Sequence, residues 1–109
     1  MIAVIGVRRQ LLILQNSISH GTRWAVNERN DAQLWQALRT RIAEFLRWQF
    51  LDGALQGTDA SEAFYVRCDE STTSADDLAA GIVVCEVGVA LVRAAEFIVF
   101  RVAQRTGPG

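Results

Sequence analysis

The chain has 109 residues, of which 50% are hydrophobic and 21% charged, and its formal net charge is −1. This length suits a single domain, and the apolar content excludes a disordered chain. No apolar run reaches the ~20 residues of a membrane-spanning helix. The opening "MIAVIGVRR" has its charges after its apolar residues, the wrong order for a secretion signal. We therefore expect a soluble protein made in the cytoplasm, with no membrane insertion.

Charge is distributed unevenly along the chain. Residues 1–50 hold seven arginines and three acids, a balance of +4, and residues 51–109 hold four arginines and nine acids, a balance of −5. Two explanations fit this pattern: the halves pack on each other, or copies of the chain meet head to tail. The absence of lysine excludes Schiff-base chemistry and a phosphate-loop lysine.

The first third of the chain predicts a helix after a short apolar start. Residues 1–7 are apolar and β-branched, which favours a short strand or the ragged start of a longer chain. Residues 8–22 predict a helix, because Leu11, Leu14 and Ile18 share one face and Gly21 is a suitable C-terminal stop. Residues 24–29 are expected to be a polar connection.

Residues 31–53 predict a long helix, with an N-cap at Asn30 or Asp31 and an end at Gly53. Its apolar stripe consists of Leu34, Leu38, Ile42 and Phe45, widened by Trp35, Leu46 and Phe50. Residues 54–62 are expected to form a loop.

The second half alternates between strands and one short helix. Residues 63–69 alternate as a strand. Residues 71–81 predict a short helix, in which Ser74 and Asp77 have capping-box spacing and Gly81 is the stop. Residues 82–92 predict a second strand, with Val83, Cys85, Val87 and Val89 on one face.

The terminal strand, residues 96–104, also alternates. One face would carry Phe97, Val99, Arg101 and Ala103, and the other Ile98, Phe100 and Val102. Its backbone edge needs a partner, either in its own sheet or in another molecule. Three strands and two substantial helices predict an α+β fold, a two-layer sandwich of two main helices on a small, mostly antiparallel sheet. We expect one domain over residues 1–104 and a flexible tail over residues 105–109.

The residues offer little for catalysis or cofactor binding. His20 is the only histidine, and Cys68 and Cys85 lie in strand-like runs without metal-site spacing. We expect buried free thiols, since a disulfide requires oxidising surroundings. No glycine-rich phosphate loop is present. The sequence therefore predicts no enzyme, no metal and no cofactor.

The arginines of the long helix are the one feature that suggests nucleic-acid binding. Arg39 and Arg41 diverge by ~200° around a helix and form no single basic stripe. The sequence pI of about 5.7 is also opposite to that of most nucleic-acid-binding modules. We expect no nucleic-acid partner.

Several stretches together resemble the C-terminal domain of phage contractile-tail sheath proteins, a family shared with contractile bacteriocins and related injection systems. They run in order from Val7 to Gln104: "RRQLLILQNSISHGTRWAV", "NDAQLW", "GALQG", "EAFYVRCDESTTSADDLAAG" and "VVCEVGVALVRAAEFIVFRVAQ". Asn27 and Arg29 stand where the family has an aromatic residue and a proline. Leu91 and Ala94 stand where it has two further prolines, so the second strand has the alternative of running on to Val92.

The resemblance implies a structural subunit, or a C-terminal fragment of one. Such subunits polymerise around an inner tail tube and contract to drive it through a target envelope, without nucleotide or metal. The alternative is a small independent protein-binding module, or the remnant of a decayed prophage. The implied partners are neighbouring sheath subunits and the inner tail-tube protein, with assembly in the bacterial cytoplasm and a final place in a virion tail or tail-like particle.

The resemblance also implies that neighbouring subunits are linked by β-strand exchange. The expected linking strand is Glu96, Phe97, Ile98, Val99, Phe100, Arg101, Val102, Ala103 and Gln104. Candidate charged contacts are Arg39, Arg41, Arg47, Asp69 and Glu70.

Overall fold

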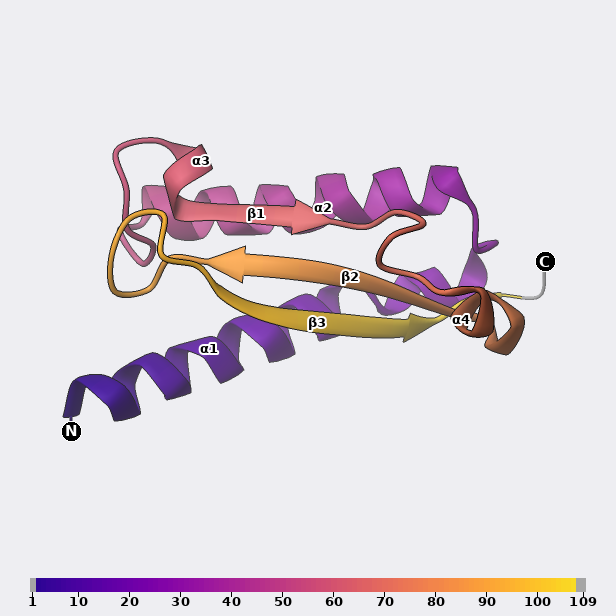
Figure 1. Cartoon of the computed structure of the whole chain (residues 1–109), viewed down its shortest axis with the longest axis horizontal. Helices are drawn as coiled ribbons and strands as arrows, with labels where there is room; N and C mark the ends of the chain where they lie inside the picture. The colour runs from indigo at the N-terminus through magenta and orange to yellow at the C-terminus, as the bar shows by residue number, and fades with distance from the viewer. Residues whose placement is uncertain (1, 108–109) are drawn as a thin grey trace.

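Three antiparallel strands form one sheet in the computed structural model, which describes residues 2–107 (Figure 1). They are β1 (Phe64–Arg67), β2 (Ile82–Val89) and β3 (Ile98–Arg105), in the order β1-β2-β3. Val89 lies opposite Phe64 on one side and Ile98 on the other. The terminal strand therefore pairs along its full length with the β2 of its own molecule.

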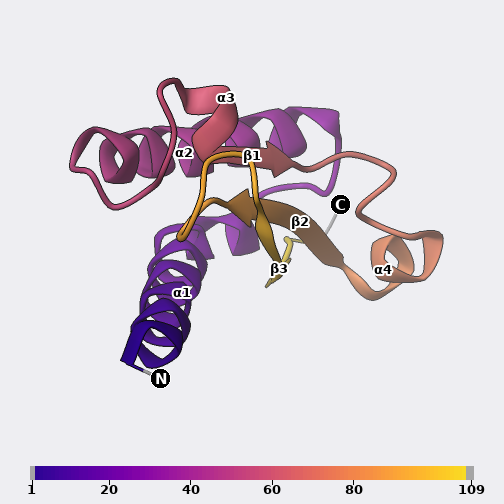
Figure 2. The ribbon, with the colours of Figure 1, turned by 60° about the vertical axis from the view of Figure 1, so that its left-hand side comes forward.

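Two long helices cover one face of this sheet. They are α1 (Ile2–Gly21) and α2 (Ala32–Leu51), and both views place α1 along β3 and α2 along β1 (Figures 1 and 2). A 3-10 helix, η1 (Arg23–Asn27), joins them, and α3 (Ala60–Ala63) and α4 (Ala75–Ala80) are short. The predicted α+β architecture of two main helices on a small antiparallel sheet is confirmed.

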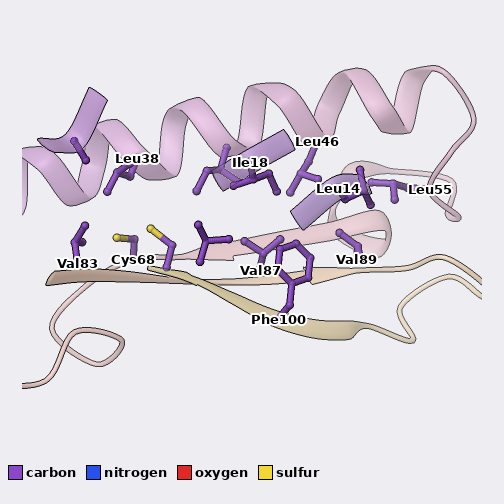
Figure 3. Close-up of a cluster of buried hydrophobic side chains, with 14 of the residues drawn as sticks. Leu14, Ile18, Leu38, Leu46, Leu55, Cys68, Val83, Val87, Val89 and Phe100 are labelled. Carbon is purple, nitrogen blue, oxygen red and sulfur yellow. The ribbon is translucent and has the colours of Figure 1, made fainter. Parts of the chain in front are cut away.

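The core fills the space between the helix layer and the sheet (Figure 3). Its members from the helices include Leu14, Ile18, Leu38, Ile42 and Leu46, and those from the sheet include Val83, Cys85, Val87, Val89, Phe100 and Val102. The strand residues alternate in sequence, so one face of each strand enters the core. Neither α1 nor α2 covers the opposite face of the sheet, and the short α4 contacts β2 (Figures 1 and 2).

An N-cap and a repeated apolar spacing define the start and the buried face of α2. The side chain of Asp31 accepts a hydrogen bond from the Leu34 backbone N–H at 3.0 Å, as expected of an N-cap. Four leucine and isoleucine side chains at a spacing of four residues are then buried: Leu34, Leu38, Ile42 and Leu46. Phe45, which the sequence placed in this stripe, is only half-buried, since a spacing of four keeps Leu46 on the core side.

The capping box predicted for α4 is present. The Ser74 side chain accepts from the Asp77 backbone N–H at 3.0 Å, and the Asp77 carboxylate accepts from the Ser74 backbone N–H at 2.9 Å. Gly81 ends the helix in the left-handed conformation, with φ +74°.

Three local predictions were wrong. Residues 2–7 form the first turns of α1 rather than a strand, and Val7 shares the core-facing side of this helix with Leu11 and Leu14. The connection over residues 24–29 contains η1, in which Ala25 is buried. The loop over residues 54–62 includes the first residues of α3.

The second predicted strand ends at Val89, which excludes a continuous strand to Val92. The Ala90 N–H donates to the Ala63 carbonyl at 2.8 Å, and the Ala90 carbonyl accepts from the Gln56 N–H at 2.8 Å. Residues 90–97 then reverse the chain into β3. Ala95 within this connection has a positive φ of 62°.

Part of the predicted tail is held by the domain. Arg105 belongs to β3, and the Gly107 N–H donates to the Glu28 carbonyl at 2.7 Å. Residues 108 and 109 lie outside the described range. Over residues 2–107, no helix has both the length and the apolarity needed to span a membrane.

Candidate functional site: the open edge of the terminal strand

The predicted linking strand corresponds closely to β3. Glu96 and Phe97 precede it, and the remaining seven predicted residues lie within it. Phe100 and Val102 are buried against the helices, whereas Val99 is 51% exposed on the opposite face. The predicted division into two faces is confirmed, and the face that includes Phe100 is the one that enters the core.

Gln104 has a structural role that the sequence interpretation missed. Its Nε2 donates to the Ser19 carbonyl at 2.6 Å and to the Thr22 hydroxyl at 3.0 Å, which fixes the end of β3 to the end of α1. Thr22 is itself buried and donates to the Ile18 carbonyl at 2.7 Å. A signal was available: Gln104 shares the face of Phe100 and Val102, and a polar side chain there needs a hydrogen-bond partner.

One edge of β3 carries almost no backbone hydrogen bonds. The Thr106 N–H donates to the Gly81 carbonyl. The backbone N–H and C=O groups of the odd-numbered residues of β2 therefore point toward β3. In the observed register their β3 partners are even-numbered. The N–H and C=O groups of Val99, Arg101 and Ala103 therefore point away from β2. Within residues 2–107, the only side chain bonded to this edge is Gln15, whose Nε2 lies 3.5 Å from the Arg101 carbonyl.

The opposite edge of the sheet is shorter and more occupied. The Phe64 N–H at the start of β1 donates to the Ala60 carbonyl. At the other end, Arg39 donates to the Cys68 carbonyl. β3 is thus the longer open edge and the better site for pairing with another strand.

The exposed face beside this edge carries a charged and aromatic cluster. Glu86 lies 3.4 Å from Arg101 and 3.8 Å from Arg67, and it accepts a hydrogen bond from the Tyr65 hydroxyl at 2.9 Å. The Tyr65 ring meets the Phe97 ring edge to face at 5.3 Å. Burial, followed by the hydrogen bond to Glu86, raises the pKa of Tyr65.

The candidate charged contacts fall into two groups. Arg39 is bonded to the Cys68 carbonyl, and the Asp69 carboxylate accepts from the Ser71 N–H at 2.8 Å, so both groups hold local structure. The Ser71 side chain and then its N–H lower the pKa of Asp69. Arg41, Arg47 and Glu70 are exposed.

The outward surface of α2 is hollowed on two sides. One hollow of about 660 Å³ includes Trp24 and Arg41, and another of about 550 Å³ includes Arg47 and Phe64. Both are bordered by Glu44. Among residues 2–107, no three His, Cys, Asp or Glu side chains gather into a metal-binding group.

The two ion pairs of the described residues both belong to the second half of the chain. They join Glu86 to Arg67 and Arg101. The halves do pack together as helix layer and sheet, but within residues 2–107 no ion pair connects them. The opposite charges of the two halves are therefore not neutralised by ion pairs between the halves within residues 2–107.

Comparison with known proteins decides the family. The family model for the phage tail sheath C-terminal domain matches residues 2–105. The chain belongs to this family. Its members are structural sheath proteins that assemble into oligomeric sheath complexes. A search of curated proteins found no match.

Two solved structures support the assignment. One is described as the cryo-EM structure of the anti-feeding prophage (AFP) baseplate, with 34% identity and a TM-score of 0.73 over 86% of this chain. The other is described as an extracellular contractile injection system, the PVC sheath complex in the contracted state, with 29% identity and a TM-score of 0.71 over 86% of this chain. The match covers 26% and 27% of those chains, so the sheath domain corresponds to about a quarter of their length.

Proposed function

We propose that this sheath domain polymerises with copies of itself around an inner tail tube and contracts to drive that tube through a target envelope. The family match over residues 2–105 and the likeness to a contracted sheath complex support this function. We further propose assembly in the bacterial cytoplasm and a final place in a virion tail or tail-like particle. We propose that the force comes from rearranged contacts between subunits, without nucleotide or metal.

The link between subunits is assigned to β3, and the observation that carries this proposal is its position as an edge strand, held in the sheet by the single ladder to β2. In strand exchange, β3 leaves its own β2 and pairs with the β2 of a neighbour. The same ladder and the same apolar contacts are then formed between molecules. Glu96 and Phe97 would belong to the extended connection.

The connection before β3 suits such an opening. Residues 92–96 are exposed, and residues 90–97 could span at most ~26 Å when fully extended. Ala95 has φ 62°, a conformation that costs a non-glycine residue roughly 1–2 kcal/mol. Extension of the connection would release this strain and break the hydrogen bond from the Ala95 N–H to the Glu62 carbonyl, which is 2.8 Å long.

A reversible lock on β3 tests the exchange. Val84 and Ala103 lie opposite each other in a non-hydrogen-bonded pair on the exposed face. A Val84→Cys/Ala103→Cys variant, made with Cys68→Ala and Cys85→Ala, can form a disulfide that holds β3 on its own β2. We expect the oxidised protein to stay monomeric where the reduced form associates, measured by size exclusion with light scattering. Equal association of the two forms would overturn strand exchange.

A proline variant separates exchange from simple edge pairing. The Ala103 N–H points away from β2, so Ala103→Pro would block a strand added to the outer edge while leaving the β2 ladder in place. Under strand exchange, this variant still associates. Under edge pairing it stays monomeric, and the Val84–Ala103 lock has no effect.

We assign the inner-tube contact to the outward surface of α2. Arg41 and Arg47 are exposed there beside the two hollows, whereas Arg39 is bonded to the Cys68 carbonyl. Arg41→Glu/Arg47→Glu should weaken co-sedimentation with purified tail-tube protein at least tenfold, with the domain still folded by circular dichroism. Arg8→Glu/Arg9→Glu is the matched control, because it makes the same change of charge at two exposed residues of α1. Unchanged co-sedimentation of the α2 double variant would exclude this surface.

A further inference from the structure

The two cysteines of the chain lie beside each other in the core. Cys85 is in β2 and Cys68 directly follows β1, with 3% and 0% exposure respectively. The β1–β2 ladder ends with Arg67 opposite Glu86, and Cys68 and Cys85 are the residues directly beyond that pair on the two segments. The Cys68 Sγ lies 3.7 Å from the carbonyl oxygen of Val84, the residue before Cys85. Figure 3 shows Cys68 on the helix-facing side of the sheet.

The backbone geometry at this pair suits a cross-link. The Ala90 N–H donates to the Ala63 carbonyl, so the backbone N–H and C=O groups of the even-numbered residues of β2 point toward β1. The backbone groups of Cys85 therefore point toward β3. Cys68 and Cys85 lie one step beyond the last pair of the ladder, where a non-hydrogen-bonded pair would follow, and Cα atoms of such a pair lie ~4.5 Å apart. This separation falls inside the ~4.4–6.8 Å range of disulfides.

The surroundings give the two thiols different roles. The hydrogen bond with Cys85 is the main cause that lowers the pKa of Cys68, and the Arg39 guanidinium acts in the same direction. The same hydrogen bond and burial raise the pKa of Cys85. Cys68 is therefore the thiol that forms a thiolate first, and the thiolate is the attacking species in thiol–disulfide exchange.

We propose that Cys68 and Cys85 form an intramolecular disulfide that ties β1 to β2 when the protein meets a small-molecule disulfide. The Cys68 thiolate attacks one sulfur of the reagent, breaking its S–S bond and releasing one small thiolate. Cys85 then loses its proton and attacks the Cys68 sulfur of the mixed disulfide, which releases the second small thiolate. Two protein thiols are oxidised and one reagent disulfide is reduced to two thiols.

The cross-link would close the segment that contains α4. It would fasten this segment to the sheet beside the Thr72 and Thr73 hydroxyls, which already contact the Val84 carbonyl at 2.7 and 3.3 Å. Closing a loop of this length should raise the thermal midpoint by about 10 °C. The pair is separate from the open edge of β3, so it is independent of the proposed strand exchange.

Both sulfurs are buried, so the test uses unfolded protein to give the small-molecule disulfide access to them. The intact chain is unfolded in denaturant and refolded with a mixture of oxidised and reduced glutathione, then trapped with iodoacetamide. We expect loss of both free thiols, a monomer lighter by two hydrogen atoms, a peptide linking Cys68 to Cys85, and a thermal midpoint that falls on reduction. Cys68→Ala and Cys85→Ala are the matched controls and should show no such dependence on reductant.

The disulfide proposal can be tested on the wild-type protein alone, even if the variants fold poorly. A native circular dichroism spectrum with two alkylated thiols at every glutathione ratio would overturn the proposal. Stable glutathione adducts or disulfide-linked dimers in place of the internal bond would also overturn it.

Discussion

Gly88 in β2 shows how one small residue supports the exposed face of the sheet. The Tyr65 ring lies directly over it, and a Cβ added at Gly88 would come within 2.0 Å of Tyr65 Cε2. The same ring donates through its hydroxyl to Glu86 and packs on Phe97. Glycine is therefore required by close approach of a side chain, since its backbone has an ordinary strand conformation.

We predict that Gly88→Ala lowers the free energy of unfolding by about 1–3 kcal/mol, because the Tyr65 ring must leave its position. Chemical denaturation monitored by circular dichroism would measure the change. The double variant Gly88→Ala/Tyr65→Ala should lose less than the sum of the two single variants. Additive losses would mean that the ring and the glycine do not act through this contact.

At the scale of an element, α4 depends on its capping box. The Ser74 backbone N–H is the main cause that lowers the pKa of Asp77, and the Ser74 side chain also contributes. A carboxyl with a lowered folded-state pKa stabilises the protein above its unfolded value, here 3.8. That contribution is lost as the pH falls through the lower pKa of the folded state.

Asp77→Asn should therefore lower the thermal midpoint at neutral pH, and its difference from wild type should shrink as the pH falls below 3.8. Asp76→Asn is the matched control, since Asp76 occupies the same first turn outside the capping box. Thermal scans at a series of pH values would measure both. A difference that persists unchanged in acid would show that the Asp77 charge is not responsible.

The elements that the sequence predicted best are those defined by short-range patterns. Ser74 and Asp77 are three residues apart, and the apolar spacing of α2 repeats over several turns, so no distant partner is needed to recognise either. The prediction for the start of α1 was wrong because it depended on a short segment without such a repeated pattern. Its β-branched residues suit a strand, but in the structure residues 2–7 are the first turns of a helix that continues to Gly21. The hydrogen bonds of Gln104 to α1 also depend on distant packing.

At the scale of the whole molecule, alternation along β3 predicted its two faces but not its partner. The ladder between β2 and β3 buries Phe100 and Val102 within one molecule, and the proposed exchange would form the same ladder with the β2 of a neighbour. The alternation of residues along β3 is compatible with both arrangements. The sequence pattern alone therefore does not identify the strand with which β3 pairs. The open outer edge likewise follows from strand order and not from composition.

The division of charge between the halves leads to a prediction about assembly. The first half carries +4 and the second −5, and both ion pairs within residues 2–107 lie in the second half. Contacts between copies that bring opposite halves together would be attractive at long range. Salt screens such attraction, since the Debye length falls from ~10 Å at 0.1 M to ~3 Å at 1 M. Backbone hydrogen bonds of an exchanged strand are far less sensitive to salt.

We therefore expect the rate of association to fall steeply with sodium chloride, while complexes already linked through β3 dissociate little faster. Stopped-flow light scattering on mixing and on dilution would measure the two rates separately. Arg41→Glu/Arg47→Glu should flatten the salt dependence of association, because it removes two positive charges from the helix layer and adds two negative ones. Association that strengthens with salt would instead assign the first contact between copies to apolar surface, and the charge division would then have no part in assembly.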